Sequence, residues 1–482
     1  MINIRTVLRV FGALLMLESV AMALALLVSF IYSEKHSFHL FLSVAITFFS
    51  GFVLHSAFRN DEITIARREG YIIVTGSWVL FSLFGTLPFL LTGSISSFTD
   101  AFFETMSGFT TTGASILSDI ESMPHSILFW RSITQWMGGM GIIVLSLAII
   151  GEIKIGNFQL FAAEVPGVTK DKLHPKLKET AKRLWAIYVV FTSSETILLV
   201  AGGMSLFDAV CHSFTTMATG GYSTKNASIA AFESPYIHAV ITLFMFLAGI
   251  NFALAYFALK GNFKKILNND EFRFYGKICI TFTVIVSAVL WLRNGYSPLN
   301  SIIYGSFQVI SIITTTGFAT ANYELWGSFL LMVIFLLMFT GGSTGSTGGG
   351  IKMLRLLILT RNSRQELHRL LHPNAVLPVR INGKAILPTL INNVLAFVVL
   401  YFLVTGISIA IISLMGYDIQ TSFGAVAASL GNIGPGIGDV GPVENYSHFP
   451  VFGKLYLSFL MLVGRLELFT VLILFTGSFY KS

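Results

Sequence analysis

Phe109-Thr110-Thr111-Thr112-Gly113 is the stretch that decides the fold, because related stretches return three times along the chain. It returns as Thr314-Thr315-Thr316-Gly317-Phe318, and in weaker form as Met217-Ala218-Thr219-Gly220-Gly221 and Gly431-Asn432-Ile433-Gly434-Pro435. The four glycines stand at near-regular positions: 113, 220, 317 and 434. Such self-similarity indicates an internal repeat. The period is too long for a solenoid and suits a unit of two membrane helices with a loop dipping between them.

The composition identifies a membrane protein with many spans. Of the 482 residues, 54% are hydrophobic and 11% are charged, and the mean hydropathy is +0.75. A soluble domain carries roughly 25% charged residues, so lipid is the main solvent of this chain. Cys211 and Cys279 lie far apart in apolar sequence, which excludes a disulfide framework and predicts two small buried side chains.

The basic residues are distributed in a way that argues against nucleic-acid binding, although the net charge is +7. If the first helix starts in the cytoplasm, most Lys and Arg residues fall in inner segments, above all within 151–183, 260–277 and 352–384. The positive-inside rule then places both termini in the cytoplasm. Two of the inner segments, 170–183 and 361–369, are expected to contact a cytosolic partner or anionic lipid headgroups. The outer loops are acidic and would concentrate cations.

The hydropathy pattern predicts ten membrane-spanning helices in an all-α protein. The expected spans are 7–32 and 39–58, then 71–92 with 127–150, 184–203 with 235–259, 275–293 with 326–340, and 387–415 with 450–475. The chain therefore divides into 1–69, with two N-terminal helices, and four repeats at 70–180, 181–270, 271–384 and 385–482. Each repeat contains a helix, a re-entrant half-helix, a loop and a second helix, so four parallel repeats can surround one axis with pseudo-fourfold symmetry. Residues 151–183 are expected to form an interfacial, partly amphipathic helix.

Four threonine-glycine loops around one axis have a chemistry that suits a dehydrated cation. Inward-facing backbone carbonyls can replace the hydration shell of the ion, and glycine permits the positive φ that orients them. Each half-helix would point its partly negative C-terminus at the ion path. Glu104, in the first half-helix, is expected to brace its loop. The candidate ion-binding residues are Thr110, Thr111, Thr112, Gly113, Ala218, Thr219, Gly220, Thr314, Thr315, Thr316, Gly317, Asn432, Ile433 and Gly434.

A glycine-rich run interrupts the second helix of repeat 3 near mid-membrane. Glycine costs roughly 1 kcal/mol in a helix interior, so the break suits a movable plug, with a flexible linker as the alternative. The run lacks the G-K-[ST] ending of a Walker A loop. Arg465 lies deep in the last helix, where an arginine costs at least about 2.5 kcal/mol and needs a cavity or a partner such as Glu467 or Glu195. The candidate gate residues are Gly341, Gly342, Ser343, Thr344, Gly345, Ser346, Thr347, Gly348, Gly349, Gly350, Lys352 and Arg465.

On these motifs the sequence resembles the Trk/Ktr/HKT superfamily of potassium transporters and is most similar to the bacterial TrkH/TrkG membrane subunit. The resemblance covers essentially the whole chain and rests on residues 109–115, 218–224, 314–320, 341–352 and 431–436. It implies K+ uptake across the bacterial inner membrane through a channel-like pore, with filter glycines at Gly113, Gly220, Gly317 and Gly434. It places the glycine run and Arg465 at the gate. It also implies a homodimer, a cytosolic nucleotide-binding regulatory subunit and no tightly bound cofactor.

Other interpretations remain open. A K+/H+ or K+/Na+ symporter on the same scaffold would need a titratable carboxylate along the path, and Glu195 and Glu467 are the deep candidates. A membrane enzyme would need a constellation of reactive side chains at one interface, and the ten histidines are scattered, so the chain is not expected to be an enzyme. The ring departs from the threonine pattern at Met217-Ala218 and at Asn432-Ile433, which predicts only a modest preference for K+ over Na+.

Overall fold

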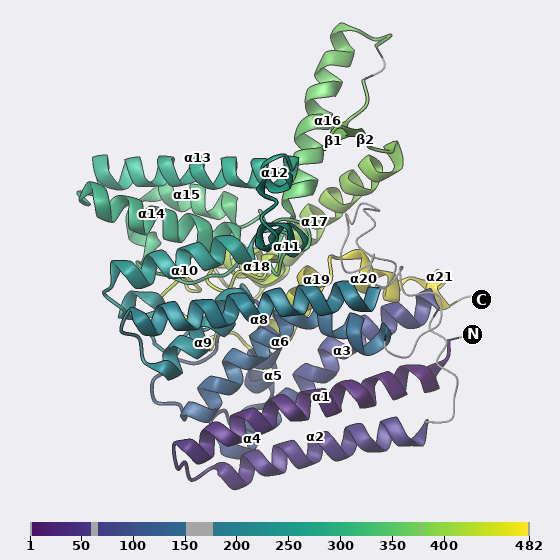
Figure 1. Ribbon diagram of the computed structural model, residues 1–482, viewed down its shortest axis with the longest axis vertical. Helices are drawn as coiled ribbons and strands as arrows, with labels where there is room; N and C mark the ends of the chain where they lie inside the picture. The colour runs from purple at the N-terminus through teal and green to yellow at the C-terminus, as the bar shows by residue number, and fades with distance from the viewer. Residues whose placement is uncertain (1, 59–65, 151–176, 376, 481–482) are drawn as a thin grey trace.

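The computed structural model describes residues 2–58, 66–150, 177–375 and 377–480, which are mainly helical (Figure 1). Most of the interfacial helix expected at 151–183 lies outside the described residues, which resume at residue 177. Helices α1 (Ile4–Ile31) and α2 (Ser37–Ala57) form an antiparallel pair on one side of the molecule. Their backbones meet at Gly12 and Gly51, where an added Cβ would lie 2.6 or 2.7 Å from the opposing carbonyl oxygen. Small residues allow this close approach of helices in lipid.

The elements are grouped below by the four predicted repeats, in chain order, although α3 and α8 begin a few residues before the predicted boundaries at 70 and 181. Repeat 1 contains α3 (Arg67–Gly85), α4 (Leu87–Thr92), α5 (Phe98–Phe109) and α6 (His125–Ile150). Repeat 2 contains α8 (Leu177–Ala201), α9 (Leu206–Met217), η1 (Ser228–Ala231), α10 (Pro235–Ala248), α11 (Phe252–Leu259) and α12 (Phe263–Leu267). Repeat 3 contains α13 (Asp270–Arg293), α14 (Pro298–Ile313), η2 (Tyr323–Trp326), α15 (Ser328–Leu337), α16 (Met353–Leu371), β1 (Arg380–Ile381) and β2 (Lys384–Ala385). Repeat 4 contains α17 (Pro388–Leu414), α18 (Ile419–Gly431), α19 (Val451–Arg465), α20 (Phe469–Leu472), η3 (Ile473–Phe475) and α21 (Gly477–Tyr480).

Six described helices are long and apolar enough to cross a bilayer, or up to eight spans when two bent pairs are counted as one span each. The bent pairs are α10 with α11, at 111°, and α19 with α20, at 112°. The continuous helices predicted at 235–259 and 450–475 are therefore wrong. Asn251 begins α11 by accepting a hydrogen bond from the backbone N–H of Ala253, and Glu467 and Leu468 end α19 with positive φ values of 58° and 53°.

A break also interrupts the second helix of repeat 3. Helix α15 has only 10 residues, which confirms that it is too short to span. The helix expected over 351–360 continues further, because α16 runs from Met353 to Leu371. In Figure 1, α16 and the small antiparallel hairpin of β1 and β2 project from the helical body.

Four short helices, α5, α9, α14 and α18, are the half-helices of the repeats. Each begins with a side chain that accepts a backbone N–H three residues later: Ser97, Ser205, Ser297 and Asp418. Such caps satisfy donors that the first helical turn leaves open. Their lengths of 12, 12, 16 and 13 residues are too short to span a bilayer. Each half-helix therefore ends inside the protein, and a threonine-glycine loop or its Asn432 counterpart follows directly.

Candidate functional site

The loops that follow the four half-helices close into a ring, here called the four-loop ring (residues 110–113, 218–221, 314–317 and 431–434). A Cβ added to Gly113 would lie 2.0 Å from the carbonyl oxygen of Gly220, in repeat 2. The same holds for Gly221 against Thr316 at 2.0 Å, Gly317 against Ile433 at 1.8 Å and Gly434 against Thr112 at 2.8 Å. Each loop thus contacts the next, and repeat 4 contacts repeat 1. Only glycine fits these positions.

The backbone has the same conformation in all four loops. Left-handed φ values of 53°, 53°, 60° and 55° occur at Thr111, Thr219, Thr315 and Asn432. Two residues later they recur, at 85°, 78°, 80° and 90°, in Gly113, Gly221, Gly317 and Gly434. The residue between them donates its backbone N–H to the carbonyl five positions earlier, at 2.8 to 3.0 Å, in every loop: Thr112, Gly220, Thr316 and Ile433.

This shared conformation corrects one predicted position. Gly221, and not Gly220, is the counterpart of Gly113, Gly317 and Gly434, while Gly220 takes the place of Thr112. Spacing along the sequence could not choose between two adjacent glycines, whereas the backbone conformation does. Gly220 remains in the ring, and its carbonyl accepts a hydrogen bond of 2.8 Å from Gln135 Nε2.

The ring side chains are buried and bonded to one another. In repeat 1 the hydroxyls of Thr110 and Thr112 lie 2.8 Å apart, and in repeat 3 those of Thr314 and Thr316 lie at the same distance. Asn432 Nδ2 donates to Thr112 Oγ1 at 2.9 Å, across the contact between repeats 4 and 1. The exposed fraction of these side chains is zero. The two repeats with the closest sequence match therefore also share their side-chain bonds.

A vestibule of about 140 Å³ lies at the glycine end of the ring. All four of Gly113, Gly221, Gly317 and Gly434 line it, which agrees with the corrected register in repeat 2. Its wall also contains charged side chains, among them Glu444, Lys225 and Arg131. The four loops therefore open together into one shared space.

The glycine run (residues 341–350), here called the glycine loop, packs against the other end of the ring. The backbone N–H of Gly349 donates to Thr315 Oγ1 at 2.7 Å, and Thr347 Oγ1 donates to the carbonyl of Met217 at 3.1 Å. An added Cβ on Gly348 would lie 2.8 Å from the carbonyl oxygen of Thr314, and one on Gly349 would lie 2.6 Å from that of Gly431. In repeat 2, Thr219 Oγ1 also donates to Thr347 Oγ1 at 3.3 Å, so the glycine loop contacts the ring directly in repeats 2, 3 and 4.

Segments from several repeats hold the glycine loop from its other sides. Ser343 donates its backbone N–H to the carbonyl of Gly249 at 2.8 Å, and Thr344 donates to Glu271 Oε1 at 2.6 Å. Lys352 Nζ bonds back to the carbonyl of Gly348. Glu271 and Lys352 are each only 7% exposed. The predicted gate segment is thus a buried, bonded loop and not a solvated linker.

Arg465 ends α19 beside the glycine loop. Its guanidinium donates to the carbonyls of Thr347 and Gly138, the latter at 2.8 Å, so it joins repeat 4 to repeats 3 and 1. Glu467, one of the partners considered for it, is paired instead with Arg355 of α16. Because the chain bends after Arg465, Arg465 bonds to the glycine loop while Glu467 bonds to α16.

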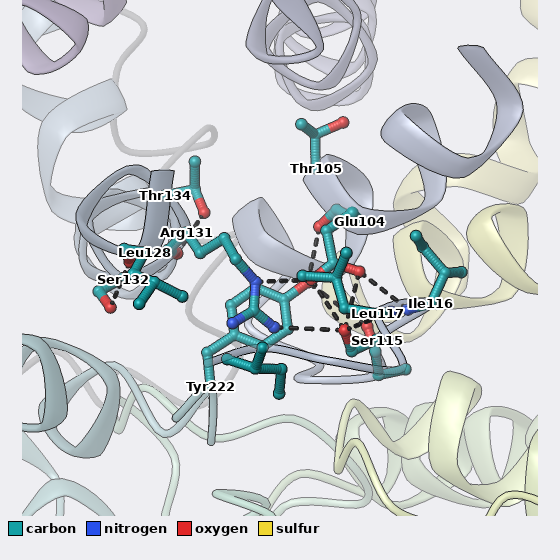
Figure 2. A network of polar contacts seen from close by, with 12 residues as sticks. Glu104, Thr105, Ser115, Ile116, Leu117, Leu128, Arg131, Ser132, Thr134 and Tyr222 are labelled. Atoms are coloured by element: carbon teal, nitrogen blue, oxygen red, sulfur yellow. Dashed lines mark hydrogen bonds and ion pairs between the residues drawn. The ribbon is translucent and has the colours of Figure 1, made fainter. Parts of the chain in front are cut away.

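A buried ion pair stands behind the loop of repeat 1 (Figure 2). Glu104 Oε1 accepts from Arg131 Nε at 2.8 Å, and the two side chains are 0% and 1% exposed. Glu104 also accepts from Ser115 Oγ and from the backbone N–H of Ile116. It therefore braces its loop as expected, but the sequence did not identify Arg131. An arginine in an apolar helix is a signal for a buried acidic partner.

Neither cysteine nor histidine forms a reactive cluster in the part of the chain that is described. Cys211 and Cys279 are buried and unpaired, as predicted. Within the described ranges no group of three His, Cys, Asp or Glu side chains could hold a metal ion. The predicted site residues instead gather in the four-loop ring and the glycine loop that packs on it.

The chain is similar to known transport proteins over its whole length. Residues 36–481 match the family model TrkH, described as a cation transport protein. The chain is 40% identical to the Trk system potassium uptake protein TrkH of Salmonella typhimurium, with both chains covered completely. It is 35% identical to the Trk system potassium uptake protein TrkG of Escherichia coli, over 100% of this chain and 99% of that protein.

Among solved structures, the potassium transporter TrkH from Vibrio parahaemolyticus superposes with a TM-score of 0.90 at 36% identity, with both chains covered completely. The relatives are named as transport proteins and not as enzymes, in agreement with the expectation from the scattered histidines. The chain therefore belongs to the TrkH family of cation transport proteins.

Proposed function

We propose that this chain mediates K+ uptake through the four-loop ring. The relatives are named as potassium uptake proteins, and the observation that carries the proposal is the closed ring of four loops with one shared backbone conformation. A ring of backbone carbonyls can replace the hydration shell of a K+ ion. The inside-negative membrane potential, worth roughly 2.3 kcal/mol per charge for each 100 mV, would drive the ion inward.

The glycine loop and Arg465 would form the gate. The loop packs directly on the inner end of the ring through Gly348 and Gly349, where a passing ion would have to leave the ring. The positive charge of Arg465 is bonded to the same loop at Thr347, so it would repel cations while the loop stays in place. Withdrawal of the loop would clear the inner end of the ring and break the bond between Thr347 and Arg465, while the bond of Arg465 to Gly138 could persist.

The proposal includes an arrangement of the chain in the membrane. Eight spans follow from the described helices when the bent pairs are counted, and α6 together with the broken α15–α16 pair would complete ten. Two N-terminal helices (1–69) would precede four repeats (70–180, 181–270, 271–384 and 385–482). Both termini would lie in the cytoplasm of a bacterial cell, by the positive-inside rule. The protein would work in the inner membrane as a homodimer, controlled by a cytosolic nucleotide-binding subunit.

Flux measurements in vesicles test this function. The purified protein in liposomes should carry 86Rb+ or K+ down a gradient, with and without the cytosolic partner and nucleotide. Flux that equals the flux of empty liposomes under every condition would overturn the proposal. The selectivity of the ring should be modest, so reversal potentials in mixed K+ and Na+ should show measurable Na+ permeation.

A coupled symporter on the same scaffold is the second candidate. Glu195 is fully buried in α8 and is the deep carboxylate that such coupling would need, whereas Glu467 is paired with Arg355. Single-channel recording separates the two mechanisms, because unitary currents indicate a channel and turnover-limited flux indicates a carrier.

A further inference from the structure

The four loops share a backbone conformation, but the side chains behind them differ from repeat to repeat. Seven positions before the left-handed residue of each loop, the half-helices carry Glu104, His212, Gln308 and Ala425. Two positions after the glycine of each loop, the segments that leave the ring carry Ser115, Ser223, Ala319 and Gly436. These two sets define equivalent bracing positions in the four repeats.

The bracing weakens from repeat 1 to repeat 4. Ser115 donates to Glu104 at 3.0 Å, and the equivalent Ser223 lies 3.0 Å from His212 Nε2. His212 Nδ1 lies 2.8 Å from the carbonyl of Asp208 and so carries a hydrogen, which makes Nε2 the acceptor from Ser223. In repeat 3 the buried amide of Gln308 has no hydrogen-bond partner among the described residues. In repeat 4, Ala425 and Gly436 have no polar side chain.

At the bracing positions only repeat 1 has a carboxylate, Glu104, and its partner Arg131 also reaches repeat 2 (Figure 2). Arg131 pairs with Glu104 and donates to Ser115 Oγ at 3.3 Å and to the carbonyl of Ser223 at 3.2 Å. Its guanidinium lies 4.1 Å from the centre of the Tyr222 ring, and Tyr222 in turn donates to the carbonyl of Glu104 at 2.7 Å. Arg131 therefore bonds to the segments that follow both loop 1 and loop 2 and connects them.

In the opposite half of the ring, the side chains that bond the loop backbone next to the glycines are neutral, and the carboxylate of Glu324 bonds further along, to the backbone N–H of Gly438 at 2.6 Å. The hydroxyl of Tyr323 donates to the carbonyl of Gly436 at 2.6 Å, and that of Tyr446 donates to the carbonyl of Gly434 at 3.0 Å. Charge-assisted hydrogen bonds are about twice as strong as neutral ones. Among the described residues, the half of the ring formed by repeats 1 and 2 thus has a buried ion pair at the bracing positions, and the half formed by repeats 3 and 4 has none there.

We propose that the Glu104–Arg131 pair determines how well the four-loop ring discriminates K+ from Na+, as a positioning element that touches no ion itself. A smaller ion is accepted when the carbonyls can move inward to meet it, and a rigid wall prevents that movement. The pair prevents it for loops 1 and 2, so most of the discrimination arises in this half. The inference rests on the proposed function of the ring.

The pair has a second consequence for the ion path. Arg131 lines the vestibule together with the four ring glycines, and its charge would repel an approaching cation if it were not neutralised. Glu104 neutralises it from behind, with a side chain that is 0% exposed. Removing one member alone would leave a buried unpaired charge, which destabilises a protein strongly. A useful variant must therefore change both residues or keep the charge.

The test is the double variant Glu104→Gln/Arg131→Gln, which leaves a neutral pair of similar size. In reconstituted vesicles the permeability of Na+ relative to K+ should rise roughly fivefold, the change that about 1 kcal/mol of lost discrimination gives. K+ flux should persist. Arg131→Lys keeps the charge but cannot make all the bonds of a guanidinium. Arg131→Lys should raise the permeability of Na+ relative to K+ by a smaller factor. This variant tests the proposal if the double variant does not fold.

Gln308→Leu is the matched control, because it changes the equivalent position of repeat 3 without removing a bond to any described residue. Its permeability ratio should equal that of the unmodified chain. An unchanged ratio in folded Arg131→Lys and double-variant protein would overturn the proposal, and so would an equal rise in Gln308→Leu. Absence of K+ flux in the unmodified chain would instead refute the proposed function, so the two failures are distinguishable.

Discussion

The four-loop ring and the glycine loop are both built from glycine and threonine backbone, yet they are held in different ways. Each ring loop follows a capped half-helix and repeats the same left-handed residues and the same backbone hydrogen bond. The glycine loop occurs once, and single bonds from Gly249, Glu271, Thr315 and Arg465 hold it. A locally imposed conformation is hard to change, whereas separate tertiary bonds can be exchanged one at a time. On the proposed function, the ring would therefore stay fixed and the glycine loop would be the part that moves.

The largest effect should come from breaking the ring itself. Gly317→Ala would place a Cβ 1.8 Å from the carbonyl oxygen of Ile433, at a φ of 80° that alanine rarely adopts. K+ flux should fall more than about tenfold, since misplaced carbonyls lose ion stabilisation of the order of 1.4 kcal/mol or more. Gly406→Ala, where an added Cβ meets nothing within 4 Å, is the control and should keep full 86Rb+ uptake.

Release of the glycine loop should have the next largest effect, in the opposite direction. Arg465→Ala removes the bonds to Thr347 and Gly138 and one positive charge below the ring. A hydrogen bond to a charged group is worth about 1.5–3 kcal/mol, so K+ flux without the cytosolic partner should rise about tenfold. Arg293→Ala, at the exposed end of α13, should leave flux unchanged. Unchanged or lower flux in folded Arg465→Ala protein would show that this arginine does not hold the gate.

A smaller increase should follow from weakening one tether of the same loop. Glu271→Gln replaces a carboxylate that accepts the backbone N–H of Thr344 at 2.6 Å with a weaker neutral acceptor. The lost difference of roughly 0.5–1 kcal/mol predicts a two- to fivefold rise in K+ flux. The exposed Glu366→Gln variant in α16 serves as control. A fall in flux with intact folding would mean that Glu271 supports the open state instead.

The smallest expected effect is a dependence on external pH at the outer mouth. Glu324 accepts the backbone N–H of Gly438 at 2.6 Å and lies against Gly441, which lines the vestibule. Partial burial, and then the nearby carboxylates of Glu444 and Asp439, raise the pKa of Glu324. A raised pKa means that Glu324 takes up its proton at a higher pH than an ordinary glutamate, so acidification removes its negative charge first.

K+ uptake should therefore decline by less than about twofold as the external pH falls from 7 to 5, because the mouth attracts cations less strongly. Glu324→Gln should flatten the part of the decline nearest pH 7. Glu233→Gln, in another outer loop, is the control. A decline of the same shape in the Glu324→Gln variant would assign the effect to other groups.

Much of this arrangement could be predicted from sequence, because it repeats. The four loops, the short half-helices before them and the break at residues 341–350 are visible as recurring motifs or as spans of the wrong length. The choice between Gly220 and Gly221 was not visible, because spacing cannot resolve adjacent glycines and only the backbone φ values distinguish them.

The bends were hidden for a different physical reason. A hydropathy profile averages over both halves of a helix pair and contains no information about the angle between them. The two pairs bent by 111° and 112° therefore each gave the pattern of one continuous span. At the second turn the residues with positive φ are Glu467 and Leu468, so no glycine marks this turn in the sequence. The Glu104–Arg131 pair joins two elements of repeat 1, and no local pattern connects residues that meet only after folding.

The most direct test of the ring as the K+ pathway is to locate the ion. Crystals of the protein in Rb+ or Tl+ should show anomalous density on the axis between Gly113, Gly221, Gly317 and Gly434, and that density should be lost in Gly317→Ala. Ordered ions found only away from these four glycines, with none in the ring of a protein that carries Rb+ flux, would contradict the account.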